Sequence, residues 1–181
     1  MLRITTGIAK NKRLKIPEIE GFRGVQEKAK MALFSMIGDK INSKVCLDLF
    51  AGSGNLGLEA LSRGALWCDF VDENPICTNA IEENINNCGF LEMSQVFRKN
   101  AIKYVSVCEK KYDFIFMDPF YGDISQTHLL KSLANVLAES GEVYYFHKNG
   151  IDIEATMEKS GLELKDSRKF GDSVFEVLSH K

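Results

Sequence analysis

The chain has 181 residues, 45% of them hydrophobic, and a net charge of −2, which fits one globular domain with a sizeable core and excludes a second full domain. It contains no run of about 18 apolar residues, which excludes a membrane-spanning helix, and its start lacks the apolar core of a signal peptide. Its five cysteines are odd in number and never spaced C-x-x-C, which argues against a disulfide framework or a zinc site. We therefore expect a soluble cytoplasmic protein with reduced thiols and no bound metal.

The first segment is a basic N-terminal arm. The first 30 residues hold eight Lys and Arg against three Glu, whereas the remainder holds fifteen basic against twenty-two acidic residues. Short β-like patterns over Leu2–Ile8 and Arg13–Ile16, separated by a polar turn around Asn11, predict a hairpin. We expect residues 1–24 to form this arm and residues 25–181 the main domain. The arm either contacts a polyanion or is a solvated hairpin with ordinary surface lysines.

An amphipathic helix is predicted directly after the arm, over Val25–Ile37. Its apolar residues recur at helical spacing and should cover the core. Gln26, Lys28 and Lys30 fall off this stripe, so we expect them on the solvent side.

From Val45 the chain alternates between short apolar runs and helical stretches. The expected strands are 45–50, 66–71, 95–98 and 112–117, and the expected helices are 55–63, 75–87 and 101–108. Such alternation implies an α/β fold with a parallel sheet and helices on both faces. Asn74 and Pro75 suit a helix start, and Gly64 and Gly89 suit helix ends.

The last third predicts two more helices, a strand and a hairpin. One amphipathic helix, ending before Gly141, is defined by Leu129, Leu130, Leu133, Val136 and Leu137. A strand over 142–147, a helix over 153–159 and a hairpin of 162–169 with 174–179, turned at 170–172, complete the chain. The histidines lack partners at ligand spacing and are expected to be ordinary; they are His128, His147 and His180.

A glycine loop lies between the first expected strand and helix. The segment Gly52-Ser53-Gly54-Asn55-Leu56-Gly57 satisfies G-x-G-x-x-G, the dinucleotide-binding fingerprint, so a nicotinamide or flavin oxidoreductase must be considered. Asp48, at the strand end, shifts the balance, because a carboxylate would face a pyrophosphate unfavourably but suits the cationic amino-acid part of S-adenosylmethionine. The glycines serve either ligand, since a missing Cβ lets the backbone approach closely. The remaining interpretation is that the glycines form an ordinary tight turn that binds no ligand.

Two further polar positions follow the next strands. Asp72 lies 20 residues beyond the first loop glycine, at a strand end, where an acidic side chain can accept hydrogen bonds from both ribose hydroxyls. The segment Asp72-Glu73-Asn74 could instead be a solvated strand end that caps the next helix. Asn100 could read an adenine amine, with the Ala101 amide reaching a ring nitrogen, or it could merely cap the helix that begins at Ala101.

The segment Asp118-Pro119-Phe120-Tyr121 follows the strand 112–117, at the strand end where open α/β sheets bind ligands. An exocyclic base amine is a poor nucleophile, because its lone pair is delocalised into the ring. The Asp118 carboxylate and the Pro119 carbonyl could accept its two N–H bonds and turn the lone pair toward a sulfonium methyl. Tyr121 or Phe120 would stack on the base, and alignment alone would supply much of the rate, without a metal. D-P-x-Y is also a common turn composition.

The chain resembles the bacterial 16S rRNA guanine-N2 methyltransferases of the RsmD type over nearly its whole length. The resemblance rests on RITTGIAKNKRLKIP, an F-R before a helix ending MALFSMI, LDLFAGSGNLGLEALSRGA, FVDEN, YDFIFMDPFY and KFGDSVFEV. It implies the seven-stranded class I methyltransferase (Rossmann-like) sheet with an N-terminal β-hairpin. It also implies S-adenosylmethionine as the cofactor and N2-methylguanine in small-subunit rRNA as the product.

The motifs and the resemblance together assign three sets of site residues. The expected catalytic residues are Asp118, Pro119 and Tyr121. The expected cofactor-binding residues are Asp48, Ala51, Gly52, Gly54, Asp72, Glu73, Asn100 and Ala101. The residues expected to contact RNA phosphates or the extruded base are Lys10, Lys12, Arg13, Lys15, Arg23 and Phe120.

The chain departs from the family pattern, and other functions stay open. The family usually has D-P-P-[YF], where this chain has Phe120 as the third residue. Its usual R-P-T is Arg23-Gly24-Val25, and its common acidic residue is the amide Asn100. Besides a monomer acting on small-subunit rRNA or the assembling subunit, three alternatives remain. They are an amino-methyltransferase for DNA adenine or protein, a dinucleotide-dependent oxidoreductase, and a non-enzymatic RNA-binding module.

Overall fold

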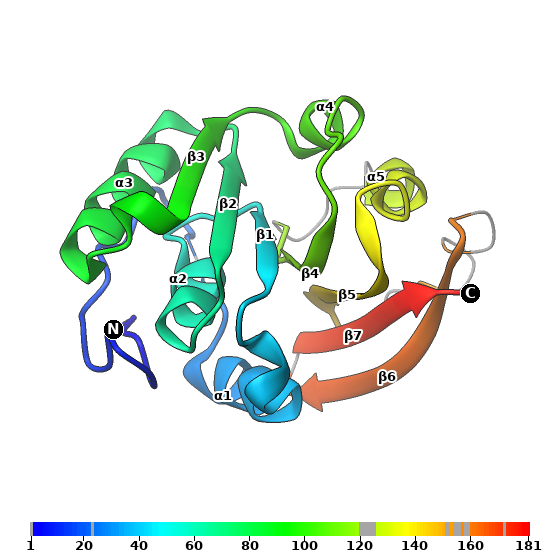
Figure 1. The fold of residues 1–181 in the computed structure, drawn as a ribbon, viewed down its shortest axis with the longest axis horizontal. Helices are drawn as coiled ribbons and strands as arrows, with labels where there is room; N and C mark the ends of the chain where they lie inside the picture. The colour runs from blue at the N-terminus through cyan, green and yellow to red at the C-terminus, as the bar shows by residue number, and fades with distance from the viewer. Residues whose placement is uncertain are drawn as a thin grey trace.

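The centre of the molecule is a seven-stranded sheet with the order β3-β2-β1-β4-β5-β7-β6 (Figure 1). The computed structural model describes residues 2–22, 24–119, 126–150, 153, 157, 160–171 and 173–181, and for 126–128 it describes the backbone alone. The strands are β1 (Val45–Leu49), β2 (Trp67–Asp72), β3 (Ser94–Arg98), β4 (Tyr112–Met117), β5 (Leu137–Lys148), β6 (Leu162–Phe170) and β7 (Ser173–His180). Strands β1 to β5 run parallel, and β7 runs antiparallel to β5 and β6. The predicted mostly parallel sheet is confirmed.

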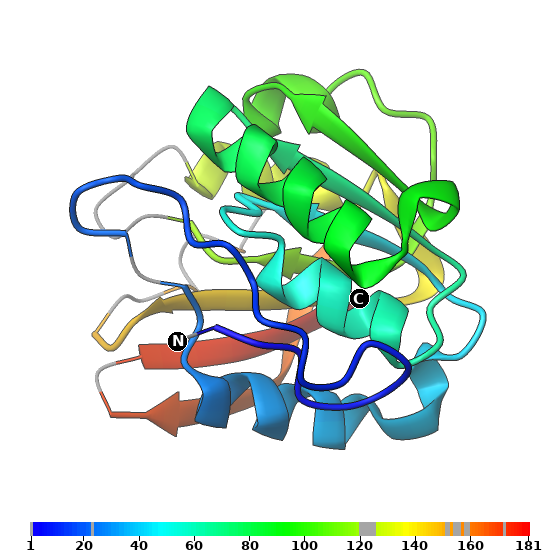
Figure 2. The ribbon, with the colours of Figure 1, turned by 90° about the vertical axis from the view of Figure 1, so that its left-hand side faces the viewer.

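Helices cover both faces of the sheet, as predicted (Figures 1 and 2). They are α1 (Glu27–Ile37), α2 (Asn55–Ser62), α3 (Pro75–Cys88), α4 (Ala101–Val105) and α5 (Gln126–Leu133), with the short 3-10 helices η1 (Gly38–Ile41) and η2 (Leu91–Met93). The apolar residues of α1, α2 and α3 pack in one core cluster, and those of α4 and α5 in another. In β1, Cys46 belongs to the first cluster and Leu47 to the second, because successive strand residues point to opposite faces.

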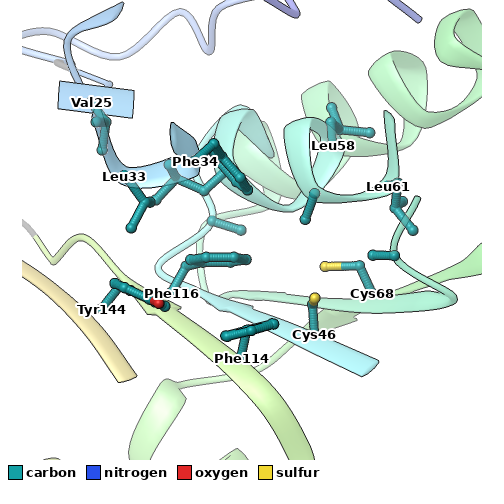
Figure 3. Close-up of a cluster of buried hydrophobic side chains, with 14 of the residues drawn as sticks. Val25, Leu33, Phe34, Cys46, Leu58, Leu61, Cys68, Phe114, Phe116 and Tyr144 are labelled. Atoms are coloured by element: carbon teal, nitrogen blue, oxygen red, sulfur yellow. The ribbon is translucent and has the colours of Figure 1, made fainter. Parts of the chain in front are cut away.

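The first core cluster fills the space between α1, α2 and the sheet (Figure 3). Phe34 of α1 lies near Phe116 of β4, with ring centroids 5.6 Å apart, and Phe116 stacks on Tyr144 of β5 at 5.9 Å. Aromatic pairs at such spacing contribute about 0.5–1.5 kcal/mol each beyond their buried area. This packing holds α1, and with it the segment that enters α1, against the sheet.

Most local signals at element ends are confirmed. Asn74 caps α3 by accepting a hydrogen bond from the first turn, Pro75 is the first helical residue, and Gly89 ends the helix with φ 82°. The C-terminal hairpin turns at Gly171, between β6 and β7, as predicted. The helix predicted over 153–159 lies mostly outside the described residues.

Two predicted helix ends are wrong, since the helix predicted over 101–108 ends at Val105 and the one predicted to end before Gly141 ends at Leu133. The amphipathic pattern from Leu129 to Leu137 predicts a helix throughout, but α5 ends before Val136, and Leu137 begins β5. Val136 O already accepts a hydrogen bond from Tyr112 N at 2.8 Å, so the chain pairs with β4 at this point. Gly141 lies inside β5, where a Cβ would sit only 2.9 Å from Tyr112 O.

The thiols match the expectation from composition. All five cysteines are free, and Cys46, Cys68 and Cys77 are buried. Within the described ranges, no helix is both long and apolar enough to cross a membrane.

The N-terminal arm pairs with itself less regularly than predicted. One antiparallel bridge joins Arg3 to Arg13. The predicted first strand does not continue to Ile8, because the arm turns onto α2, where Ile8 N donates to Ser62 O at 2.9 Å. Gly7 lies in this turn with φ 86°, and a Cβ there would lie 1.7 Å from Ser62 O. The arm is therefore an irregular loop fastened to α2 rather than a regular hairpin.

The arm also contributes to the core of the main domain. Its apolar side chains Ile4, Ala9 and Leu14 are buried in the first core cluster, together with residues of α1 and α2. The division between residues 1–24 and 25–181 stays a prediction, since the two segments share this cluster.

Lys30 of α1 is buried, which corrects its predicted place on the solvent side. It is 1% exposed. Its ammonium donates to Arg3 O and Asn55 Oδ1, each at 2.7 Å, and pairs with Glu59 Oε2 at 2.9 Å. Burial lowers the pKa of Lys30, and the charge of Glu59 opposes that shift. The ion pair thus joins the arm, α1 and α2.

We expect Lys30→Met to lower the free energy of unfolding by about 3 kcal/mol, because it leaves a buried carboxylate without its ammonium partner. Urea denaturation followed by circular dichroism measures this loss. Lys28→Met, at an exposed position of the same helix, is the matched control and should change the free energy by less than about 0.5 kcal/mol. Equal losses in the two variants would contradict a stabilising role for the buried pair.

Candidate active site

Two cavities open at the carboxyl ends of β1, β2 and β4, and both are lined by Phe50. They enclose about 610 Å³ and 890 Å³ of empty space, part of it open to solvent. The first cavity is lined by Gly21, Phe22, Gly24, Val25, Asp48, Phe50, Ala51, Gly52, Ser53, Asn55, Leu56, Asp118 and Pro119. The second cavity is lined by Ile19, Phe50, Val71, Asp72, Glu73, Asn74, Pro75, Cys77, Lys99 and Ala101. Both cavities therefore lie along the edge where parallel sheets bind ligands.

The chain turns sharply between β1 and α2. Phe50 and Gly52 both have φ 57°, and Gly54 N donates to Ala51 O at 2.6 Å. Phe22, from the segment before α1, lies so close to Gly52 that a Cβ there would come within 2.9 Å of its ring. A side chain at Gly52 would therefore fill part of the first cavity, whereas glycine leaves bare backbone facing it.

Asp48 is buried beside this loop, with 2% of its surface exposed. Its Oδ2 accepts a hydrogen bond from Gly57 N, in the first turn of α2, at 2.8 Å. Burial raises the pKa of Asp48 well above its ordinary value; the Gly57 bond opposes the shift, and the charges of Asp118 and Asp72 add to it. A cation in the first cavity would stabilise the ionised carboxylate.

Asp118 follows β4 and lines the first cavity together with Pro119. Its side chain is half-buried, and burial raises its pKa to about 7. The first cavity therefore contains the carboxyl groups of Asp48 and Asp118, and Asp72 lies near enough to affect Asp48. Such a group of acids repels anions and favours a ligand that carries positive charge.

Ser53 presents an unsatisfied hydroxyl in the first cavity. The residue is 1% exposed, and its Oγ has no hydrogen-bond partner among the described residues. A buried polar atom without a partner costs free energy, so it marks a place where a ligand or water supplies the missing bond. A water or a polar ligand group beside the glycine loop could therefore supply the partner that this hydroxyl lacks.

Asp72 lines the second cavity at the end of β2. Its Oδ2 accepts from Gly52 N and its Oδ1 from Asn74 N, each at 2.9 Å. Burial raises the pKa of Asp72, and both backbone bonds oppose that shift. The carboxylate therefore supports the glycine loop and the start of α3, and it also faces a cavity in which hydroxyl groups could donate to it.

Asn100 caps α4. Its Oδ1 accepts from Ile102 N at 3.1 Å and Lys103 N at 3.4 Å, and its Nδ2 donates to Glu73 Oε2 at 3.1 Å. Among the described residues that line the two cavities, its neighbour Ala101 is present and Asn100 is not. The capping alternative accounts for this side chain, and its reading of an adenine stays a prediction.

Residues 2–179 match the family model described as conserved hypothetical protein 95. The chain belongs to this family. Its similar relatives include the Bacillus subtilis protein YlbH, named as a candidate rRNA methyltransferase, which is 31% identical over 86% of this chain and 88% of its own. Escherichia coli ribosomal RNA small subunit methyltransferase D is 29% identical over 77% of this chain and 68% of its own. The resemblance to the RsmD type is confirmed.

A solved structure of the same shape supports the fold assignment. The Escherichia coli protein yhhF, named as a candidate methyltransferase, superposes with a TM-score of 0.86 over 99% of this chain and 98% of its own, at 22% identity. This family member therefore has the class I methyltransferase fold, as predicted.

In this family member, the predicted site residues separate into three groups. Those that line the cavities are Asp48, Ala51, Gly52, Asp72, Glu73, Ala101, Asp118 and Pro119. Those described elsewhere are Gly54, Asn100, Lys10, Lys12, Arg13 and Lys15. Those outside the described residues are Arg23, Phe120 and Tyr121. In the described part of the chain, no group of three or more His, Cys, Asp or Glu could hold a metal ion.

Sequence reasoning missed part of the cavity lining. Ile19 and Phe22 belong to the arm, which charge alone marked as a polyanion-binding segment, yet they form cavity walls. Phe22 lies in the F-R motif that carries the resemblance, and this was the available signal. Ser53 lies between two predicted site residues, and Lys99 follows a predicted strand, but neither side chain belongs to a sequence pattern that would have indicated a site.

Proposed function

We propose that this protein transfers a methyl group from S-adenosylmethionine to the N2 amine of a guanine in small-subunit rRNA. The observation that carries the proposal is the group of acids around a bare glycine loop at the sheet edge, with Asp48 buried and Asp72 and Asp118 half-buried. The fold is that of the class I methyltransferases, and the names of the relatives supply rRNA as the substrate. Cytoplasmic location, a monomeric state and the choice between naked rRNA and an assembling subunit stay predictions.

The residues present fit S-adenosylmethionine. When bound, this cofactor supplies an activated methyl group on a sulfonium. In the first cavity, Asp48 would bind the ammonium group of the amino-acid part of the cofactor. The Ser53 hydroxyl would gain its missing hydrogen bond from the same part, and Gly52, without a side chain, would let the ligand approach the backbone closely. In the second cavity, Asp72 would accept hydrogen bonds from the ribose hydroxyls, and Ala101 lines the adenine end. A dinucleotide would bring a doubly charged pyrophosphate against the same carboxylates.

Asp118 and Pro119 line the first cavity and, in this proposal, would align the guanine amine. Their carboxylate and carbonyl oxygens would accept the two N2–H bonds, which turns the nitrogen lone pair toward the methyl carbon. The methyl group would form its new bond to N2 as its bond to the cofactor sulfur breaks, and the proton that N2 releases would pass to Asp118. With a pKa of about 7, this carboxyl can accept that proton and return it to water.

Transfer of tritiated methyl groups tests the proposal. Purified protein is incubated with labelled S-adenosylmethionine and, separately, with immature small subunits, naked rRNA and DNA. We expect label in RNA or in subunits. Label in DNA alone would contradict the proposed RNA substrate. If calorimetry showed that the protein binds a nicotinamide dinucleotide but not S-adenosylmethionine, the proposed methyltransferase activity would be wrong.

The basic arm supports an RNA substrate. Lys10, Lys12 and Arg13 are exposed, and the described residues place no carboxylate within ion-pair distance of them. Lys15 differs, because its ammonium pairs with Glu83 at 2.6 Å. The first three cations are therefore free to neutralise phosphates.

Replacing Lys10, Lys12 and Arg13 together by alanine should reduce the salt dependence of RNA binding. Three lost phosphate contacts on single-stranded RNA lower the slope of log K against log salt by about 2. Fluorescence anisotropy at several salt concentrations measures the slope. Lys40→Ala, at an exposed position outside the arm, is the control, and an unchanged slope in the triple variant would remove the arm from the RNA interface.

A further inference from the structure

The side chain of Asn84, in α3, joins the N-terminal arm to the glycine loop. The residue is 2% exposed. Its Oδ1 accepts a hydrogen bond from Lys15 N at 2.7 Å, and its Nδ2 donates to Lys15 O at 3.0 Å and to Ser53 O at 2.9 Å. The amide thus uses its oxygen and both of its N–H groups, so turning it over would break all three hydrogen bonds. The orientation of Asn84 therefore depends on the arm and on the loop together.

Further contacts hold the same stretch of the arm on α3. Asn87, one turn further along the helix, donates from Nδ2 to Arg13 O at 3.2 Å, and this bond involves the arm and α3 only. Leu14 is buried in the first core cluster together with apolar residues of α3. The chain around Leu14 is therefore the part of the arm that is fixed to α3.

This fixed stretch lies between the exposed cations of the arm and the residues that line the cavities. Lys10 and Lys12 precede it and are exposed, whereas Ile19 and Phe22 follow it and line the second and the first cavity. Ser53 lines the first cavity as well, and its Oγ has no hydrogen-bond partner among the described residues. A ligand in the first cavity and a polyanion on the cations would therefore order the same stretch of chain from its two ends.

We propose that Asn84 is a positioning residue that couples RNA binding on the arm to cofactor binding in the first cavity, so that each ligand raises the affinity for the other. The coupling rests on the proposed function, because RNA and S-adenosylmethionine are its two ligands. The first ligand orders Lys15, Asn84 and Ser53, and the second ligand then binds to a segment that is already ordered. Linkage makes the effect equal in both directions. The coupling favours the complex of protein, cofactor and RNA over either complex with one ligand.

Amide hydrogen exchange of the wild type, followed by NMR, tests the link without RNA. Addition of S-adenosylhomocysteine should slow the exchange of the Lys15 N–H, which donates to Asn84, by at least about fivefold. The reference is the Gly89 N–H, which donates to Ile85 O at the end of the same helix and should change much less. Equal slowing at both amides would show a general stabilisation by the ligand and would overturn the link. Unchanged exchange at Lys15, with calorimetry showing that the ligand binds, would overturn it as well.

Variants test the coupling with RNA. Equilibrium dialysis measures the affinity for labelled S-adenosylhomocysteine with and without naked small-subunit rRNA, which should raise the wild-type affinity at least about fivefold. In Asn84→Ala this effect of RNA should vanish, and the loss in methyl transfer should appear in KM for both substrates rather than in kcat. Asn87→Ala, which removes a bond between the arm and α3 but none to the glycine loop, is the matched control and should keep the effect. Equal loss in the two variants would show a general loosening of the arm and would refute the assignment.

Failure of the coupling is distinguishable from failure of the proposed function. If the wild type binds both S-adenosylhomocysteine and RNA but neither ligand changes the affinity for the other, the coupling is wrong and the proposed function stands. If the wild type binds no S-adenosylhomocysteine or no RNA, the proposed function is wrong. If Asn84→Ala does not fold, the exchange of the Lys15 N–H in the wild type decides.

Discussion

Replacing Asp118 by asparagine is expected to lower kcat for methyl transfer by about 10²–10³-fold, the usual loss when one preorganised polar group at the reacting centre is removed. The amide keeps the shape but loses the negative charge that accepts from the target amine and stabilises the positive charge developing on it. Cofactor affinity should stay close to that of the wild type, because the proposal assigns the binding of that ligand to Asp48 and Asp72. Single-turnover transfer of labelled methyl groups measures the rate, and calorimetry measures the affinity.

The pH dependence checks the same role. In the proposed role the carboxylate is the active form, and burial raises the pKa of Asp118 to about 7. Wild-type kcat/KM should therefore rise with pH and level off above about 7. For Asp118→Asn, kcat/KM should not show this rise with pH. If Asp118→Asn lost cofactor binding but kept the rise of kcat/KM with pH, the assigned role of Asp118 would be wrong.

Although Asp118→Asn should lower the activity, it should raise the stability of the folded protein at high pH. The folded-state pKa of Asp118 lies above the unfolded value of about 4, so stability is full below about pH 4 and is lost as pH rises through about 7. Asparagine cannot ionise, and we expect a higher Tm than that of the wild type at pH 8, with the difference vanishing at low pH. Calorimetric unfolding at both pH values measures this, and a lower Tm at pH 8 would argue that the carboxylate is stabilised by a partner.

Replacing Asp48 by asparagine is expected to weaken S-adenosylmethionine binding by about 100-fold, within the range of 2–5 kcal/mol for losing one partner of a buried charge pair. The amide oxygen of the introduced side chain would still accept from Gly57 N, so the glycine loop should keep its form. Titration calorimetry of the folded variant measures the loss. Asp39→Asn, at an exposed position in η1, is the matched control. Unaltered affinity in Asp48→Asn would remove Asp48 from the cofactor site.

The raised pKa of Asp48 adds a pH dependence to cofactor binding. Burial favours the protonated carboxyl in the free protein, whereas the cationic ligand favours the carboxylate. Binding should therefore release a proton, and affinity should fall as pH is lowered. Calorimetry in buffers of different ionisation enthalpy detects the proton, which Asp48→Asn should no longer release.

Local patterns predicted the features that depend on neighbouring residues. The strand and helix alternation, the Asn74 cap and the glycine loop follow from spacing within one segment, and the comparison with relatives confirms the fold they indicated. The predicted extension of the helix to Leu137 was wrong, because the apolar spacing at this point suits either a helix or a buried strand. The hydrogen bond from Tyr112 to the neighbouring Val136 makes this part of the chain pair with β4.

Features that depend on distant residues could not be predicted from spacing. Lys30 looks like a surface lysine until Glu59 and the backbone of Arg3 are brought to it by folding. The pair of His147 and Glu176 forms because β5 and β7 run side by side, although 29 residues separate them. The gathering of acids at the strand ends was predictable, since parallel strands bring their carboxyl ends to one edge.

The most direct test of the central claim is the identity of the methylated nucleoside. Small-subunit rRNA from cells lacking this protein is methylated by the purified enzyme with labelled S-adenosylmethionine, digested to nucleosides and separated by mass spectrometry. We expect label in N2-methylguanosine, appearing at least about 100-fold more slowly with Asp118→Asn. Label in N6-methyladenosine, or no label in RNA from any source, would contradict the proposed function.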